Sequence, residues 1–170
     1  MSDFQSLIKT VPDFPKKGIN FKDITPLLKD PIAVANCLDE MMPDTKQKVD
    51  FVVGIESRGF ILGPLLAQRL NCGFVPIRKK GKLPGQTIGI KYNLEYGDAE
   101  IEMHSDAIKT GNRILLHDDV LASGGTAAAA LELIDMLGGV VVQCSFIIEL
   151  KSLGGRSKLS NQKIRSVCYF

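Results

Sequence analysis

The most constraining feature of this sequence is a set of short apolar runs that alternate with stretches of helical period. The runs are rich in β-branched and aromatic residues, as buried parallel strands are. They cover residues 50–55, 73–78, 113–117 and 140–148. Helical periodicity follows the first run over 60–70 and the third over 126–137. This alternation predicts right-handed βαβ units and a doubly wound, mostly parallel α/β sheet with flanking helices.

The part of the chain before this sheet has a different pattern. Prolines divide it into short pieces at Pro12, Pro15, Pro26 and Pro31. One amphipathic helix is expected over about 32–42. We therefore expect a small N-terminal appendage over about residues 1–35 within a single domain that covers residues 1–170.

A second departure from the sheet pattern lies over about 79–104. Residues 79–86 are rich in Lys, Gly and Pro, which favours a flexible loop. Residues 88–92 and 99–104 are predicted to pair as an antiparallel hairpin that forms a flap.

Charge and composition exclude several classes of protein. The formal net charge is only +2, which gives no field strong enough for general binding of nucleic acid. No apolar stretch approaches the length of a membrane span, and the first residues lack the pattern of a signal peptide. We therefore expect a cytoplasmic protein without a nucleic-acid or membrane partner. The cysteines lie far apart, which favours reduced and mostly buried thiols at Cys37, Cys72, Cys144 and Cys168.

The segment from Leu115 to Thr126 carries the strongest chemical signal. An apolar strand leads into adjacent acids, Asp118 and Asp119, followed by a turn of small residues and a helix start. Backbone amides in such a turn, together with the helix N-terminus behind it, form a cradle for phosphate. Gly124 and Gly125 permit positive φ and close approach. Carboxylates accept hydrogen bonds from sugar hydroxyls and bind Mg²⁺, so the pattern predicts a ribose beside the phosphate.

The whole string resembles the ribose-phosphate signature of the type I phosphoribosyltransferases, which bind 5-phosphoribosyl 1-diphosphate. The resemblance implies that Asp118 and Asp119 hold the ribose hydroxyls. It places the 5-phosphate of the donor at Ala122, Ser123, Gly124, Gly125 and Thr126. His117 stands where the family usually has an aliphatic residue, and a single strand histidine more often packs in a core than takes part in catalysis.

Further matches extend over nearly the whole chain and point to the adenine-using members of the family. Gly54 to Phe60 reads as a strand end followed by a turn into a helix. The resemblance identifies it as the diphosphate loop, formed by Glu56, Ser57 and Arg58. It implies that Arg58 contacts the leaving group and that the Glu56–Ser57 peptide is cis. The alternative is a helix N-cap by Ser57 with Arg58 in solvent.

The basic segment from Arg78 to Gly85 resembles the flexible loop that closes over the leaving group in this family. Cations that fold over diphosphate stabilise its developing charge and help to exclude water. The cations expected at the diphosphate are Arg78, Lys79 and Lys82. Downstream, Glu95 is implied to lie near N7 of the base, where a protonated carboxyl donates a proton. A basic run is otherwise usually a solvated face.

Residues 12–26 resemble the small hood that covers the purine. Phe21 is then the expected stacking partner of the ring. Backbone groups around Asn20 and Lys22 are expected to read the amino edge of adenine. These two residues replace ones that are more often aliphatic and arginine in the family. Without the resemblance, Phe21 would be assigned to the core.

The resemblance implies Mg²⁺-dependent transfer of the 5-phosphoribosyl group to adenine, which gives AMP and diphosphate in purine salvage. N9 of adenine attacks C1 of the ribose without a covalent enzyme intermediate, and no Ser-His-Asp or Cys-His arrangement is visible. Mg²⁺ is expected to be carried mainly by the donor and by water rather than by a protein cage. The resemblance also implies a homodimer, with the diphosphate loop and the basic loop near the partner subunit.

Three alternatives remain open from the sequence. A phosphoribosyltransferase for hypoxanthine, guanine or xanthine would share the donor site, although the strand around Glu95 and the hood with Phe21 favour adenine. A ligand-sensing regulator of the same fold would need a DNA-reading element, and neither a helix-turn-helix pattern nor a strongly basic helix is visible. An inactive homologue is disfavoured by the acidic pair, Arg58 and the basic loop.

Overall fold

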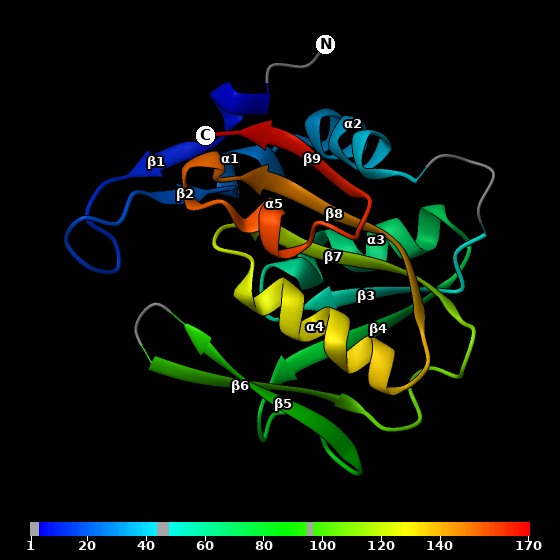
Figure 1. Cartoon of the computed structure of the whole chain (residues 1–170). Helices are drawn as coiled ribbons and strands as arrows, with labels where there is room; N and C mark the ends of the chain where they lie inside the picture. The colour runs from blue at the N-terminus through cyan, green and yellow to red at the C-terminus, as the bar shows by residue number, and fades with distance from the viewer. Residues whose placement is uncertain (1–3, 44–47, 95–96) are drawn as a thin grey trace.

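The computed structural model of the chain describes residues 4–43, 48–94 and 97–170. Within these residues the chain forms a seven-stranded sheet in the order β5-β6-β4-β3-β7-β8-β9 (Figure 1). Parallel pairing joins β4 (Gly73–Lys79), β3 (Phe51–Ile55), β7 (Arg113–Leu121), β8 (Val140–Glu149) and β9 (Ile164–Tyr169). The antiparallel strands β5 (Thr87–Leu94) and β6 (Gly97–His104) continue the sheet beyond β4. The predicted α/β fold with an antiparallel flap is confirmed.

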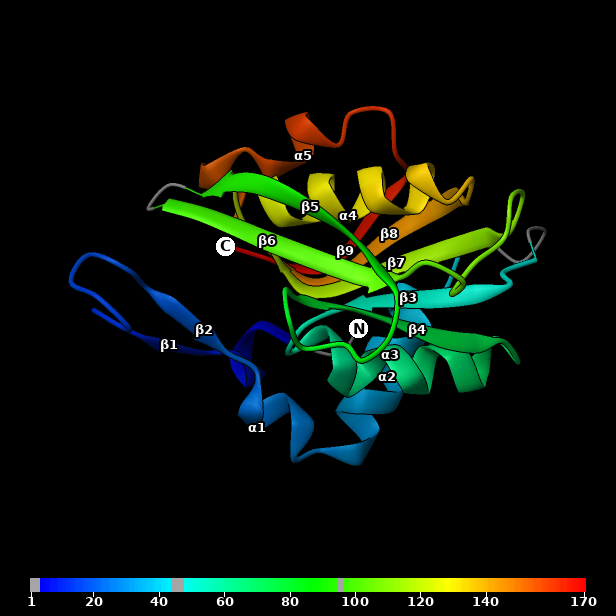
Figure 2. The same ribbon diagram turned by 90° about the horizontal axis from the view of Figure 1, so that it is seen from below.

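Helices cover both faces of the sheet. Figure 2 shows α4 (Gly125–Met136) on one face, and α3 (Gly59–Arg69) with α2 (Pro31–Met41) on the other. The start of α2 follows from its sequence, because Pro31 opens it and the Asp30 carboxylate accepts hydrogen bonds from the amides of Ile32 and Ala33. The short elements are η1 (Phe4–Leu7), α1 (Thr25–Leu28), η2 (Lys151–Leu153) and α5 (Gly155–Lys158).

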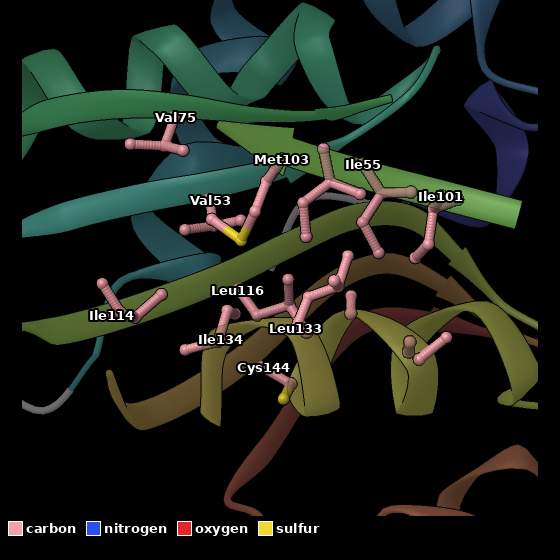
Figure 3. Packing of buried hydrophobic residues seen from close by; sticks show 14 of the residues in the cluster. Val53, Ile55, Val75, Ile101, Met103, Ile114, Leu116, Leu133, Ile134 and Cys144 are labelled. Carbon is pink, nitrogen blue, oxygen red and sulfur yellow. The ribbon is translucent and has the colours of Figure 1, made fainter. Parts of the chain in front are cut away.

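The hydrophobic core is divided by the sheet into two layers. Successive side chains of a strand point to opposite faces, so Leu115 packs toward α2 and α3 while Leu116 packs toward α4. Figure 3 shows Leu116 beside Leu133 of α4, and Val53 beside Met103 in the same layer. Each fully buried leucine or isoleucine stabilises the fold by about 1.5–3 kcal/mol, and burial on both faces explains the almost continuously apolar strands.

The structure differs from the expected elements in several places. β7 continues to Leu121, so the acidic pair lies inside the strand rather than after it. The reason is that β8 pairs with β7 as far as Leu121, whereas pairing with β3 ends at His117. The sequence also did not predict the last strand, β9, or the short helix α5 before it.

The N-terminal appendage is an antiparallel ribbon of β1 (Lys9–Val11) and β2 (Phe21–Asp23). It projects from the body of the sheet, with its connecting turn at the far tip (Figure 1). Among the residues described, no helix has both the length and the apolar character of a membrane span.

The cysteines agree with the expectation of reduced, mostly buried thiols. Cys37, Cys72, Cys144 and Cys168 carry free thiols, and all are buried except Cys72, which is partly exposed. Burial raises the pKa of the Cys37 and Cys144 thiols to about 12. These thiols are therefore packing groups rather than nucleophiles.

A small polar layer lies under the C-terminal end of α2. The Gln143 amide nitrogen and the Ser145 hydroxyl both donate to the Met41 carbonyl oxygen, at 3.1 and 2.9 Å. This carbonyl lies in the last turn of a helix, where no partner within the helix is available. His117 is fully buried in the same layer, with Nδ1 3.0 Å from the Ser145 carbonyl oxygen. Burial lowers its pKa from 6.5 to about 4.

The buried imidazole predicts a specific loss of stability in acid. A histidine whose pKa is lower in the folded state favours folding fully above pH 6.5, and this contribution is lost as the pH falls toward 4. Between pH 7 and pH 5 the wild-type free energy of unfolding should fall by about 2 kcal/mol more than that of His117→Gln. Urea unfolding at both pH values measures the difference. Equal losses in the two proteins would contradict the assignment.

Candidate active site

The candidate site lies at the topological switch point of the sheet, beside β3. β4 pairs with one edge of β3 and β7 pairs with the other, so the chain builds outward on both sides of β3. Ligands of open α/β sheets bind outside the carboxyl ends of strands at such a point. The pairing of β3 with β7 ends at Gly54 and His117. Beyond these residues the two strands separate, and they lead into the predicted diphosphate and phosphate loops.

Two hollows open at this point and share a wall. The larger has a volume of about 580 Å³, within the usual range for ligand pockets. Its polar lining includes Glu56, Lys79, Lys80, Tyr92, Asp118 and Thr126. The smaller has a volume of about 70 Å³ and is lined by Asp118 and residues 120–127. The shared wall contains Asp118 and Thr126, so a ligand with a sugar and a phosphate can extend from one hollow into the other.

The smaller hollow is formed by the predicted phosphate loop. Ala122, Ser123, Gly124, Gly125 and Thr126 all line it. Gly124 adopts a φ of +80°, which glycine accepts without strain, and α4 begins at the next residue. The Tyr92 hydroxyl of the flap donates to the Thr126 hydroxyl at 3.2 Å. The backbone amides at the start of α4 therefore border a hollow whose electrostatics favour an anion.

The two acids of β7 have different environments. Asp118 lines both hollows, and its Oδ1 accepts a hydrogen bond from the Asp119 amide at 2.8 Å. Asp119 is only 5% exposed, and its Oδ2 lies 2.8 Å from Nε of Arg58. Burial raises the pKa of both carboxyls; the neighbouring carboxylate raises that of Asp118 further, while Arg58 opposes the rise at Asp119. Asp118 thus faces the ligand space and Asp119 is neutralised by Arg58.

Arg58 connects the sheet to the N-terminal ribbon. Besides its ion pair with Asp119, it donates from Nη1 to the Lys22 carbonyl oxygen at 2.9 Å. Its guanidinium lies over the Phe21 ring, 4.6 Å from the centroid, at a distance suited to a cation–π interaction. The alternative with Ser57 as N-cap and Arg58 in solvent is wrong, because Arg58 itself precedes α3 and is held by these groups. The expected cis peptide between Glu56 and Ser57 is present.

The diphosphate loop and the basic loop are joined by an ion pair. Both Glu56 oxygens accept from Arg78, at 2.9 Å from Nη2 and 3.3 Å from Nε, and one also accepts from the Lys79 amide at 2.9 Å. The hydrogen bonds from Arg78 are the main cause of the lowered pKa of Glu56. Arg78 also donates to the Lys82 carbonyl oxygen at 2.8 Å. Of the predicted diphosphate cations, Lys79 lines the larger hollow and Arg78 is already paired.

Sequence reasoning missed Glu102, whose carboxylate binds backbone amides of the basic loop. Glu102 of β6 is 6% exposed and accepts hydrogen bonds from the Lys82 and Leu83 amides, both at 3.1 Å. It also accepts from the Thr87 hydroxyl at 3.2 Å. The amide and hydroxyl donors lower its pKa. A usable signal was the alternation in β6, which buries Ile101 in the core and turns Glu102 to the face beneath the loop.

Of the residues predicted to bind a base, Phe21 and the Lys22 backbone lie against Arg58. Phe21 meets Phe14 edge to face, with ring centroids 5.2 Å apart. The Lys22 ammonium donates to the Thr10 hydroxyl at 2.8 Å and lies 3.9 Å from the centroid of the Phe170 ring. Asn20 is exposed. Glu95, the predicted proton donor, lies outside the described residues.

The role of Glu102 predicts a local change in the basic loop. Glu102→Gln removes a charged acceptor shared by two amides, so hydrogen exchange at Lys82 and Leu83 should become about tenfold faster. Glu100→Gln is the matched control, because Glu100 lies on the same strand and binds the Lys80 ammonium. Exchange measured by NMR that is unchanged in Glu102→Gln, or equally faster in both variants, would count against this role.

Comparison with known proteins agrees with this geometry. The family described as "Phosphoribosyl transferase domain" matches residues 24–164. The adenine phosphoribosyltransferase of Ruegeria pomeroyi is 52% identical, over 98% of this chain and 94% of the relative. The crystal structure of the enzyme from Rhodothermus marinus has a TM-score of 0.95 at 51% identity and covers 98% of this chain and 96% of its own. The Saccharomyces cerevisiae enzyme, solved with an imino-altritol bisphosphate and adenine, has a TM-score of 0.91 at 38% identity, with 97% and 96% covered.

Proposed function

The chain belongs to the adenine phosphoribosyltransferases, and we propose that it performs their reaction with the groups gathered at the β3–β7 crevice. It transfers the 5-phosphoribosyl group of 5-phosphoribosyl 1-diphosphate to adenine and produces AMP and diphosphate, a glycosyl transfer of purine salvage. The observation that carries this reading is the shared wall of the two hollows, where a carboxylate faces a sugar-sized space beside an anion cradle.

The donor's 5-phosphate binds in the smaller hollow. Residues 122–126 line it, and α4 begins at Gly125, so the positive end of this helix borders the hollow and offers backbone amides to the phosphate. Asp118 accepts from a ribose hydroxyl, since it stands between the two hollows. Asp119 takes part after Arg58 releases it, because in this structure their ion pair occupies one carboxylate oxygen.

The diphosphate leaving group is neutralised by cations of the basic loop and by Arg58. Lys79 lines the larger hollow, and Lys82 lies on the same basic loop. Arg58 and Arg78 are paired with Asp119 and Glu56, and each contributes by exchanging its carboxylate for a diphosphate oxygen. Glu56 and Ser57 supply the turn that carries the leaving group. Positioning of this kind needs no covalent intermediate.

Adenine is bound between the ribbon and the flap. Phe21 offers an aromatic face, and backbone groups near Asn20 and Lys22 read the amino edge. The Lys22 carbonyl and one face of Phe21 are occupied by Arg58 in this structure, so base binding on that face requires Arg58 to move. Glu95 acts as the general acid toward N7.

Magnesium fits the chemistry of the larger hollow. Glu56 and Asp118 are carboxylates on its wall, and Mg²⁺ in proteins commonly binds one or two carboxylates together with substrate phosphates and water. When bound, the ion neutralises part of the charge of the diphosphate. The donor and water supply most of its ligands.

The protein functions as a cytoplasmic homodimer. The dimer is supported by α3, which directly follows the diphosphate loop and exposes Ile61 and Leu65 one helical turn apart, by 43% and 38%. A partner that covers this helix would lie close to the diphosphate loop. Sedimentation velocity that finds only monomers would exclude this assembly. The cytoplasmic location rests on the sequence pattern alone.

The proposed function predicts that the purified protein forms AMP from adenine, 5-phosphoribosyl 1-diphosphate and Mg²⁺. Asp118→Asn should lower kcat/KM about 100-fold, because a charged hydrogen-bond partner of the ribose is lost. The same variant should be more stable without ligand at pH 7, since the raised pKa of Asp118 means that its charged form costs folding free energy. Chromatography of AMP and thermal unfolding measure the two effects.

Asp135→Asn is the control for this experiment, because it neutralises an exposed carboxylate on α4 away from the hollows. If wild-type protein forms no AMP, the function is wrong. If Asp118→Asn keeps full activity, the ribose role is wrong.

The proposed acid predicts a separate effect on turnover. Glu95→Gln should lower kcat by about 100-fold or more, the usual contribution of general acid catalysis, with little change in donor affinity. Steady-state kinetics with varied donor and adenine separate the two parameters. Unchanged kcat would rule out this role.

A further inference from the structure

The phosphate loop rests against the short helix α5, which the proposed mechanism does not use. The backbones of Gly124 and Gly155 touch: a β-carbon on Gly124 would lie 2.7 Å from the Gly155 carbonyl oxygen. A β-carbon on Gly155 would in turn lie 2.9 Å from the Gly124 nitrogen and would collide with the Ala122 carbonyl oxygen. Non-bonded contacts of carbon are favourable only near 3.5–4.0 Å. The first residue of α5 therefore supports the back of the loop by main-chain contact.

An ion pair between the partly exposed Arg156 and the buried Glu149 holds α5 in this place. Arg156, which follows Gly155, donates from Nε and Nη2 to the two oxygens of Glu149, at 2.9 and 2.5 Å. Glu149 is 5% exposed, and the Ser166 hydroxyl donates to it at 2.7 Å. A two-point pair between a guanidinium and a carboxylate fixes orientation as well as distance. The pair thus joins α5 to the end of β8 and, through Ser166, to β9.

The same carboxylate lies beside the start of the phosphate loop. Glu149 of β8 is in register with Leu121, the last residue of β7, and the Leu150 amide donates to the Leu121 carbonyl oxygen at 2.9 Å. Ala122 follows at once. The sheet therefore fixes the start of the loop, and Gly155 fixes its turn. Glu149 takes part in both, because its backbone pairs with Leu121 and its side chain holds Arg156, the neighbour of Gly155.

We propose that the Glu149–Arg156 ion pair is a positioning element for the donor's 5-phosphate, acting through the contact of Gly155 with Ala122 and Gly124. It touches no substrate; it keeps the loop amides in their binding arrangement before the donor arrives. The inference rests on the proposed function for the identity of the ligand. Small displacements of such donors weaken binding strongly, so the effect of losing the pair falls on the donor rather than on adenine.

The test compares Arg156→Gln with Lys158→Gln, which removes the same charge from the exposed side of the same helix. Arg156→Gln should raise the KM for 5-phosphoribosyl 1-diphosphate and the Kd for ribose 5-phosphate about tenfold. The KM for adenine and the kcat at saturating donor should stay within about twofold of wild type, as should all constants of Lys158→Gln. Arg156→Lys, which keeps the charge but loses the two-point geometry, should lie in between.

Three outcomes would overturn the proposal. The first is an unchanged donor KM and ribose 5-phosphate Kd in Arg156→Gln. The second is an equal loss for donor and adenine, which indicates general damage to the fold. The third is an effect of Lys158→Gln as large as that of Arg156→Gln. If Arg156→Gln does not fold, Arg156→Lys decides with the same constants.

The ribose 5-phosphate measurement separates this proposal from the proposed function. Wild-type protein that makes no AMP but binds ribose 5-phosphate more tightly than Arg156→Gln would defeat the function and retain the positioning role. If wild-type protein makes AMP but wild type and Arg156→Gln bind ribose 5-phosphate equally, the function is retained and the positioning role is defeated.

Discussion

The parallel pairing of β3 with β7 is the constraint on which the rest of the site depends. It brings together two strand ends that are far apart in the sequence, and it stops at Gly54 and His117 so that the following segments separate. One of them becomes the proposed diphosphate loop, and the other carries the acids and the proposed phosphate loop. The β3–β7 pairing thus positions the starts of both segments, and pairing of β7 with β8 carries the acids on as far as Leu121.

The arginines near these strand ends compensate the charge of the neighbouring carboxylates. Two neighbouring carboxyls on β7 are poorly solvated, and one guanidinium compensates for part of the cost. Arg78 and Glu56 form a second pair, in which Glu56 lines the larger hollow. In the ligand-free protein the strongest cations are therefore engaged by acids, and an anionic substrate competes with carboxylates that the protein already holds in place.

The sequence predicted the elements that have a strong local signature. Apolar runs identified four parallel strands, and the string ending at Thr126 identified the glycine turn that lines the smaller hollow. Contacts between residues far apart in the sequence left no such signature. Nothing around Glu149 or Arg156 indicates that they meet, and Arg58 gave no sign of its contact with Phe21. The extension of β7 to Leu121 depends on pairing with β8, which only the fold reveals.

The contact between Gly124 and Gly155 also limits how this sequence can change during evolution. Each glycine occupies the space that the other's β-carbon would need, so a larger residue at one position cannot be offset by a change at the other. Most packed pairs tolerate drift by exchanging a large and a small partner. This pair has no smaller residue left to exchange, so descendants of this protein keep both glycines or must rebuild the connection between β8 and β9.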